Sequence, residues 1–205
     1  MLMNMPLDAF TRAVASDAPV PGGGSVSALA GALAAALTAM VAELTLKKEK
    51  FAAVHPEMAD LQAAAGRLQA ALAKAVDEDA ESYRGVLAAY RMPKSDDAQK
   101  QARRQAVQAA FLRAAEVPLK VAECAARVME LSGTAADRGN PDMVTDAGVG
   151  IVMARAAALG ALMNVKINLK SVEDRALADG MRRKAAALEA AVLQKEAQLL
   201  KRLDF

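Results

Sequence analysis

An all-α fold, an up-and-down bundle of about six long helices in a single domain, is predicted by three features of this 205-residue chain. Alanine, the strongest helix former, supplies about a quarter of the residues. Aromatic residues make up 3% of the chain and β-branched residues are sparse, so strands have little to be built from. Apolar residues recur at helical spacing over most of the length, and no shift in composition divides residues 1–205 into two domains.

The helical pattern is interrupted by proline, glycine and capping residues, which give the expected boundaries. The expected helices cover residues 6–16, 25–44, 56–92, 95–131, 142–169 and 173–202. Pro118 lies inside the fourth helix and should kink it, because proline lacks the backbone donor. Residues 132–141 contain two glycines and a proline and form the main predicted loop.

The second expected helix carries two stripes of different size. A bulky stripe can fill a core, and a stripe of small residues lets another helix or a flat ligand approach closely. The bulky stripe consists of Leu29, Leu33, Leu37, Met40 and Leu44, and the small stripe of Ser27, Gly31, Ala34, Thr38, Ala42 and Thr45. Helices that are apolar all round need more partners than one chain offers, so we expect a homodimer or a higher oligomer.

Charge, cysteine content and the N-terminus bear on partners and location. The net charge of +2, with Lys and Arg spread along the helices, predicts no nucleic-acid partner. A single histidine (His55) and a single cysteine (Cys124) leave no disulfide framework and no zinc or iron site of His and Cys in one chain. The N-terminus lacks the pattern of a secretion signal, so we expect a cytoplasmic protein. Residues 26–44 approach membrane-spanning length, but their alanine-rich composition favours a buried core helix over a membrane span.

The run Pro21-Gly22-Gly23-Gly24-Ser25 leads directly into the second expected helix. A backbone without side chains that ends at a helix N-terminus offers free N–H groups and a partial positive charge to an anionic or electron-rich ligand. The same residues also fit a plain tight bend. The run alone therefore leaves both interpretations open.

Asp79 stands out within the acidic cluster of residues 77–81, most of which should be solvated. Its offsets from Tyr83, Val86 and Tyr90 place all four residues on one side of a helix. An acid on this face is a candidate general acid/base with a shifted pKa. The alternative is a partly exposed carboxylate beside core aromatics.

The fifth expected helix carries polar residues on one face. Asp146 and Asn164 are five helical turns apart, and Asn168 lies one turn further on. Small residues separate them, which predicts either a slot with polar ends or a close helix–helix seam. Lys47 and Lys48, after the second helix, complement its dipole or bind a carboxylate-rich tail.

No nucleophilic triad can be assembled from these residues. Cys124 lies in the middle of an expected helix, far in sequence from the only histidine. His55 directly precedes Pro56 and is expected to be a loop or capping residue.

Several motifs occur together and in order along nearly the whole chain. They are Pro21–Ser25, Glu43-Leu44-Thr45 with Lys47-Lys48, Asp79–Tyr83, Ala115–Pro118, Gly139-Asn140-Pro141, Thr145-Asp146-Ala147 and Asn164–Leu169. This ordered set resembles the cyclodeaminase/cyclohydrolase family. The family includes the cyclodeaminase half of formiminotransferase-cyclodeaminase and the short serine-cycle methenyltetrahydrofolate cyclohydrolases.

The resemblance implies an all-helical homodimer that binds tetrahydrofolate derivatives without a metal or another cofactor. It implies that Asp79 is the catalytic carboxylate, with Tyr83 as its neighbour, and that the glycine turn forms part of the folate pocket. The two lysines would suit a glutamate tail. The remaining folate-binding residues that it implies are Asn140, Asp146, Asn164 and Asn168. Glu43 stands where many members carry Asn, so the resemblance assigns it no role.

The implied reaction is hydrolysis of 5,10-methenyltetrahydrofolate to 10-formyltetrahydrofolate, which we favour because no formiminotransferase domain is fused to this sequence. The methenyl bridge is already a cation, and one carboxylate can serve first as base and then as acid. The alternative reaction is cyclodeamination of formiminotetrahydrofolate with release of ammonia. The alternative of another class is a folate-binding or scaffold protein without catalysis.

Overall fold

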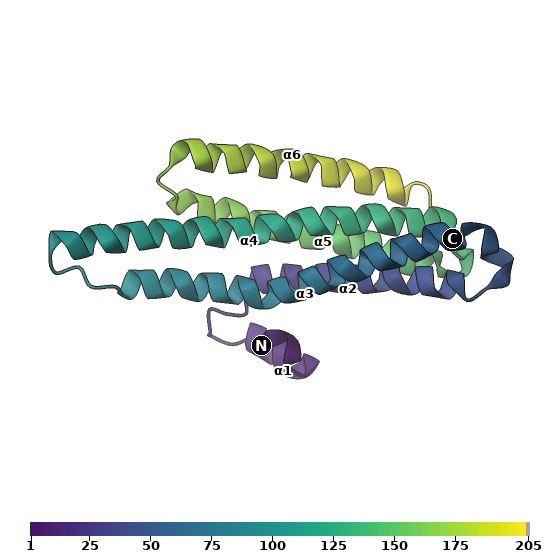
Figure 1. Cartoon of the computed structure of the whole chain (residues 1–205), viewed down its shortest axis with the longest axis horizontal. Coiled ribbons are helices and arrows are strands. Elements are labelled where there is room, and N and C mark those ends of the chain that lie inside the picture. Colours follow the sequence, from purple (N-terminus) through teal and green to yellow (C-terminus); the bar gives the residue numbers. More distant parts are fainter. Residues whose placement is uncertain (204–205) are drawn as a thin grey trace.

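Five long helices run alternately up and down and form the body of the molecule (Figure 1). The structure is a computed structural model that describes residues 1–203. They are α2 (Gly23–Leu46), α3 (His55–Arg91), α4 (Asp97–Arg138), α5 (Val144–Asn168) and α6 (Arg175–Leu200). No strand occurs in the described residues, so the predicted all-α class is confirmed. The described residues form the six α-helices that the sequence predicts, but the first of them, α1 (Leu7–Val14), has only eight residues and lies to one side of the bundle.

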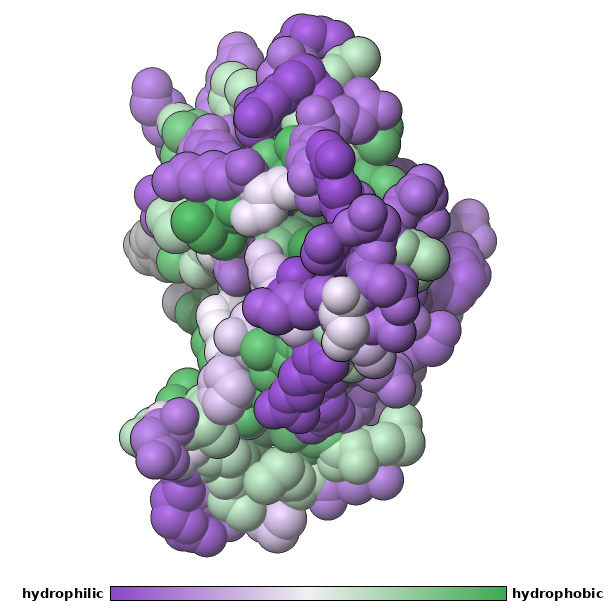
Figure 2. All heavy atoms as spheres, turned by 90° about the vertical axis from the view of Figure 1, so that its left-hand side faces the viewer, coloured by the Kyte–Doolittle hydropathy of each residue, from purple (hydrophilic) through white to green (hydrophobic). Residues whose placement is uncertain are grey.

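Short 3₁₀ turns join or precede the long helices. They cover Leu2–Asn4, Glu49–Val54, Pro141–Met143 and Leu169–Ser171. The first of them is tied to α3, because the backbone N–H of Leu2 donates to the Asp77 carboxylate at 2.5 Å. The end view in Figure 2 is mostly hydrophilic, and a more hydrophobic band runs along its lower part, on the side where α1 lies.

The boundaries of α4 differ from the prediction at both ends. Its N-cap is Asp96, whose side chain accepts from the backbone N–H of Gln99 at 2.8 Å, so the helix begins at Asp97 and not at residue 95. The predicted loop 132–141 is wrong, because α4 continues to Arg138. Gly133 is buried so close to Leu199 of α6 that a β-carbon would overlap the leucine, so this glycine serves helix packing and not a turn. The helix also runs unbroken through Pro118 (Figure 1).

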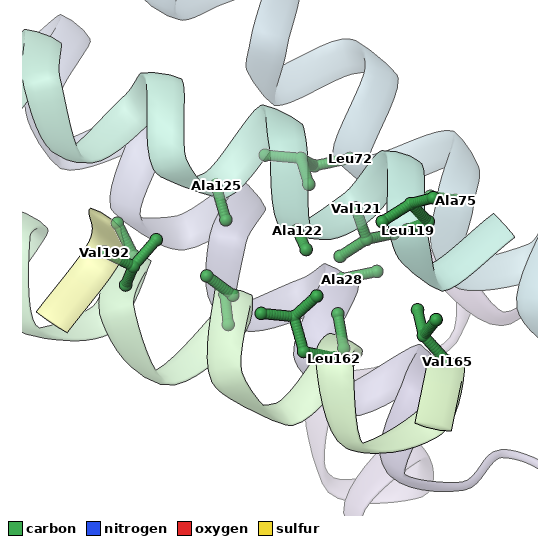
Figure 3. Close-up of a cluster of buried hydrophobic side chains, with 14 of the residues drawn as sticks. Ala28, Leu72, Ala75, Leu119, Val121, Ala122, Ala125, Leu162, Val165 and Val192 are labelled. Carbon is green, nitrogen blue, oxygen red and sulfur yellow. The ribbon is translucent and has the colours of Figure 1, made fainter. Parts of the chain in front are cut away.

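The core is built mainly from alanine, valine and leucine where α2 to α5 meet. Figure 3 shows Ala28 of α2, Leu72 of α3, Ala122 of α4 and Leu162 of α5 pointing toward one another. Small side chains bring the helix backbones close together and leave few gaps, which is how a chain so rich in alanine obtains dense packing. All six residues of the small stripe of α2 are buried.

The bulky stripe of α2 lies on the outside of the chain, contrary to the expectation that it fills the core. Leu33 and Met40 are exposed, and Leu29, Leu37 and Leu44 are only half-buried. The reason is that the small stripe can approach α3 and α5 more closely, so it faces inward. Leu33 and Met40 therefore remain exposed in one chain, and the other three leucines of the stripe are only partly covered.

The seam between α2 and α5 depends on glycine. A β-carbon on Gly160 of α5 would overlap the hydroxyl oxygen of Ser27, which is itself held by a 2.7 Å bond to the carbonyl of Gly23. We expect Gly160→Ala to lower the free energy of unfolding by about 1–3 kcal/mol, because the two helices must separate. Chemical denaturation measures this change.

Gly180→Ala in α6 is the matched control. A β-carbon there meets nothing within 4 Å, so alanine should raise the free energy of unfolding by up to about 1 kcal/mol through helix propensity. Equal effects of the two substitutions would contradict the close α2–α5 seam.

Candidate functional site

The N-terminus of α2 meets the middle of α3 at Asp79. Gly22 is the N-cap of α2 and supplies no side-chain cap, so the first N–H groups of the helix need partners from elsewhere. The backbone N–H and the hydroxyl of Ser25 both donate to the Asp79 carboxylate. Gly24 makes this possible, because any β-carbon there would overlap that carboxylate. Asp79 thus caps α2 from a neighbouring helix.

The Ser25 hydroxyl can stabilise Asp79 in both of its protonation states. Its Oγ lies 3.0 Å from Oδ2 of Asp79 and 2.9 Å from the carbonyl oxygen of Val76. A hydroxyl has one proton to donate and lone pairs to accept with. When Asp79 is ionised, Ser25 donates to the carboxylate; when Asp79 is protonated, its O–H can donate to Ser25, which then donates to Val76.

Opposing effects set the acidity of Asp79. Burial raises the pKa of Asp79 above the ordinary range of an aspartic acid, because the ionised form loses water. The side-chain and backbone donors of Ser25 favour the ionised form and lower the pKa, by less than burial raises it. The result is a carboxyl group that gains a proton more readily than an exposed aspartate and that remains hydrogen-bonded after losing it.

A pocket of about 280 Å³ opens in front of Asp79. Asn164 and Asn168 line it from the end of α5, and Tyr83 lines it from the turn of α3 that follows Asp79. The glycine turn forms one wall of the pocket, which fits the interpretation that this turn faces a ligand. The described residues that line the pocket are Pro19, Val20, Gly22, Gly23, Gly24, Asp79, Ser82, Tyr83, Ala114, Asn164, Ile167 and Asn168.

Other predicted features of this site turn out differently. Pro21 is buried behind the turn and does not line the pocket. Tyr83 and Tyr90 are both exposed, and Tyr90 lies against Phe111, so the alternative of a carboxylate beside core aromatics is wrong. Both asparagines are hydrogen-bonded to carbonyls: the amide nitrogen of Asn164 donates to Gly160 at 2.9 Å.

The sequence did not reveal every lining residue. Ser82 lies one turn from Asp79, which could have indicated it. Ala114 lies four residues before Pro118, so the proline already showed that the carbonyl of Ala114 lacks its helical donor. Pro19, Val20 and Ile167 have apolar side chains without polar groups, and nothing in the sequence pattern indicates that they line a pocket.

Four predicted substrate-binding residues lie at the opposite end of the bundle. Along α2, Lys47 is about 35 Å from Gly24, and along α5, Asp146 is about 27 Å from Asn164. Lys48 forms an ion pair with Asp142 at 3.0 Å. These residues can reach a ligand in the Asp79 pocket only from a second copy of the chain.

Asn140, the fourth of these residues, has a clear structural role. It is buried, its backbone N–H donates to the Thr45 hydroxyl at 2.8 Å, and its side chain accepts from the N–H of Asp142. Lys47 is likewise paired, with Glu43 at 3.0 Å. The site residues predicted from the sequence therefore lie in two groups, at opposite ends of the bundle within one chain.

The remaining polar candidates lie outside the pocket. His55, expected to be a loop or capping residue, is the first residue of α3, and its ring lies 3.3 Å from the carbonyl of Lys48. Cys124 is half-buried in α4, and burial raises the pKa of its thiol. Within residues 1–203, no cluster of three or more His, Cys, Asp or Glu side chains is positioned to share an ion.

Comparisons with known proteins agree on one family. The model of the formiminotransferase-cyclodeaminase family matches residues 6–187. The chain is 35% identical to methenyltetrahydrofolate cyclohydrolase of Methylorubrum extorquens, over 87% of this chain and 86% of that one. It is 32% identical to formimidoyltransferase-cyclodeaminase of Rattus norvegicus over 91% of this chain, but it spans only 35% of that longer protein.

A solved structure shares the whole fold. The crystal structure of formiminotetrahydrofolate cyclodeaminase from Thermotoga maritima superposes with a TM-score of 0.88, at 28% identity, over 99% of this chain and 98% of the other. The match extends over nearly all residues of both chains, so it includes the helices that form the pocket.

The dual contact of Ser25 leads to a prediction for the acidity of Asp79. In Ser25→Ala the carboxylate loses a donor while staying buried, so we expect the pKa of Asp79 to rise further. Carbon-detected NMR titration of the carboxyl group measures it. Ser82→Ala is the matched control, because the Ser82 hydroxyl donates to the backbone carbonyl of Asp79 and not to its side chain. A pKa that stays the same or falls in Ser25→Ala would contradict this assignment.

Proposed function

Because the chain belongs to the formiminotransferase-cyclodeaminase family, we propose that it hydrolyses 5,10-methenyltetrahydrofolate to 10-formyltetrahydrofolate. The similarity to the named cyclohydrolase supports this choice, since it covers nearly the full length of both chains. The observation that carries the proposal is the placement of Asp79. Among residues 1–203 it is the one carboxyl group lining the pocket, and burial raises its pKa.

The reaction needs one group that first takes and then returns a proton. Water attacks the bridging carbon of the cationic methenyl group, its oxygen bonds that carbon, and Asp79 takes one of its protons. The bond from that carbon to N5 then breaks, and Asp79 returns the proton to N5. The second proton of the water leaves to solvent as the carbonyl of the formyl group forms, so the reaction releases one proton overall.

The surroundings of Asp79 suit both halves of this cycle. The N-terminal end of α2 and the donors of Ser25 stabilise the ionised form that accepts the proton. Burial stabilises the protonated form that returns it. The ionised carboxylate also stabilises the positive charge of the bound methenyl group, more strongly in a pocket than in water.

Cyclodeamination of formiminotetrahydrofolate is the second candidate function. The observation that favours it is the close match to the Thermotoga maritima protein, which is named as a cyclodeaminase. The same carboxyl group would protonate the departing ammonia while N10 closes the ring. Asp79 would act as the acid and base in both candidate reactions, so an assay with each substrate is needed to distinguish them.

We also propose that a second copy of the chain covers α2 and α5. Seven apolar side chains on these two packed helices are between 37% and 66% exposed: Val26, Leu33, Met40, Val149, Val152, Met163 and Ile167. The cations of α5, Arg155 and Lys166, are turned to Glu196 and Glu189 of α6, so they leave this face apolar. An apolar face of this kind can pair with itself around a two-fold axis, which supports a homodimer.

The length and hydropathy of the same helices would also permit a membrane span. Gly23–Leu46 and Pro141–Ser171 are long and apolar enough, but 56% and 50% of their most apolar windows are buried inside the bundle. Core helices of soluble proteins have these properties. We therefore keep as predictions a cytoplasmic location, no membrane or nucleic-acid partner, folate as substrate and not cofactor, and no metal.

The role of Asp79 has a direct test. Asp79→Asn keeps the size of the side chain but cannot take the proton from water, so kcat should fall at least about 100-fold. Loss of methenyltetrahydrofolate absorbance measures hydrolysis, and ammonia release from formiminotetrahydrofolate measures the alternative. Asp77→Asn, two residues earlier and outside the pocket, is the matched control and should keep its activity.

Each result of this test has a definite meaning. Full activity of Asp79→Asn would remove Asp79 from the mechanism. Wild-type protein that binds 5-formyltetrahydrofolate but turns over neither substrate would be a folate-binding protein without catalysis, and the proposed enzyme function would be wrong.

The homodimer is tested by one charge on the α2–α5 face. We expect Leu33→Glu to convert the dimer to a monomer, because a buried, unpaired carboxylate is costly at an apolar interface. Light scattering after size-exclusion chromatography gives the mass. Leu177→Glu on α6, at a leucine of similar exposure, should remain dimeric. A wild-type protein of monomer mass would refute the interface.

A further inference from the structure

Pro118 leaves a gap in the hydrogen bonding of α4 at the pocket wall. In an α-helix the carbonyl of residue 114 accepts from the N–H of residue 118, and proline has no N–H. The carbonyl of Ala114 is instead bonded by the side chain of Asn168, the last residue of α5, whose amide nitrogen lies 2.7 Å away. Ala114 and Asn168 both line the pocket in front of Asp79.

This bond fixes which end of the Asn168 amide is free. A carbonyl can only accept, so the group that faces Ala114 must be the NH₂ and the oxygen Oδ1 must point elsewhere. Among residues 1–203 no protein group donates to that Oδ1. Asn168 therefore offers an unpaired acceptor in the pocket wall.

Asn164 provides a comparison, because no proline frees a carbonyl for it on α4. One turn earlier on α5, its amide nitrogen donates to Gly160 of its own helix, so nothing on α4 holds it. Asn168 is held between two helices because α4 presents a carbonyl without a helical donor. The ring of Pro118 also pushes that carbonyl away from the helix axis, toward a partner outside the helix.

We infer that Pro118 is a positioning residue for substrate: it frees the Ala114 carbonyl, which orients Asn168 so that Oδ1 accepts from an N–H of the bound ring system. A reduced pterin carries a cyclic amide and an amino group, and both can donate in this way. The inference rests on the proposed function for the identity of the ligand. The orientation of Asn168 rests on the hydrogen bond alone.

The test restores the missing donor. In Pro118→Ala the new N–H draws the Ala114 carbonyl back along the helix axis and weakens its bond to Asn168. We expect KM for methenyltetrahydrofolate to rise about three- to tenfold, the effect of one hydrogen bond, while kcat changes less than twofold. The midpoint of thermal unfolding should be equal to or above that of wild type, because an interior proline destabilises a helix.

A double-mutant cycle separates positioning from general packing. Asn168→Ala should raise KM as Pro118→Ala does, and the double variant should raise it no further, because both changes remove one interaction. Asn168→Ala should lower the unfolding midpoint, since the buried Ala114 carbonyl loses its donor. Adding Pro118→Ala should restore the midpoint without restoring KM. Pro93→Ala, in the turn between α3 and α4, is the control and should change neither quantity.

The outcomes are distinct from those of the proposed function. A wild-type KM in Pro118→Ala, effects on KM that multiply in the double variant, or a Pro118→Ala protein less stable than wild type would each overturn the inference while leaving the enzyme assignment intact. The recovery of stability in the double variant is measured without any folate. Inactive wild-type protein that fails to bind 5-formyltetrahydrofolate would instead refute the proposed function.

Discussion

The close approach of α2 to its neighbours is the constraint on which the site depends. Along α2 the inward-facing residues are mostly small, with Val41 the largest, and glycines remove the last atoms that would keep the backbones apart. At Gly24 the space left by the missing β-carbon is filled by the Asp79 carboxylate. The same requirement that lets an alanine-rich chain pack densely therefore also places the Asp79 carboxyl group against a helix N-terminus. Gly24 therefore determines both the packing of α2 against α3 and the position of the Asp79 carboxyl group.

That placement exposes Asp79 to opposing electrostatic effects, and the balance between them is useful. A carboxylate that burial alone acted on would hold its proton, and one with strong donors alone would not regain it at neutral pH. Here burial raises the pKa while Ser25 lowers it, and burial has the larger effect. Because the Ser25 hydroxyl has a second partner in the carbonyl of Val76, it can donate a hydrogen bond in either protonation state of Asp79. The cost of switching between them is kept small.

Much of this could be predicted from the sequence, and the failures have a common cause. Helical spacing correctly predicts the long helices. The ordered motifs predict that Asp79, Asn164 and Asn168 belong to one site, and these three residues line one pocket. Spacing along a helix says which residues share a face but not which face turns inward or which ends meet. For this reason helical spacing predicts the bulky stripe in the core and Gly133 in a loop, whereas the stripe lies outside and Gly133 accommodates Leu199.

The places where the helices depart from regularity mark the site better than any single motif. The N-terminus of α2 lacks a side-chain cap of its own, and α4 lacks a donor at Pro118. Each defect is repaired by a polar side chain from a neighbouring helix, Asp79 in one case and Asn168 in the other. Both side chains line the same pocket, and each uses only some of its polar atoms in the repair. Regular helices elsewhere in the bundle need no such repair, so the occurrence of both irregularities at one pocket supports the proposal that they orient polar groups toward a ligand.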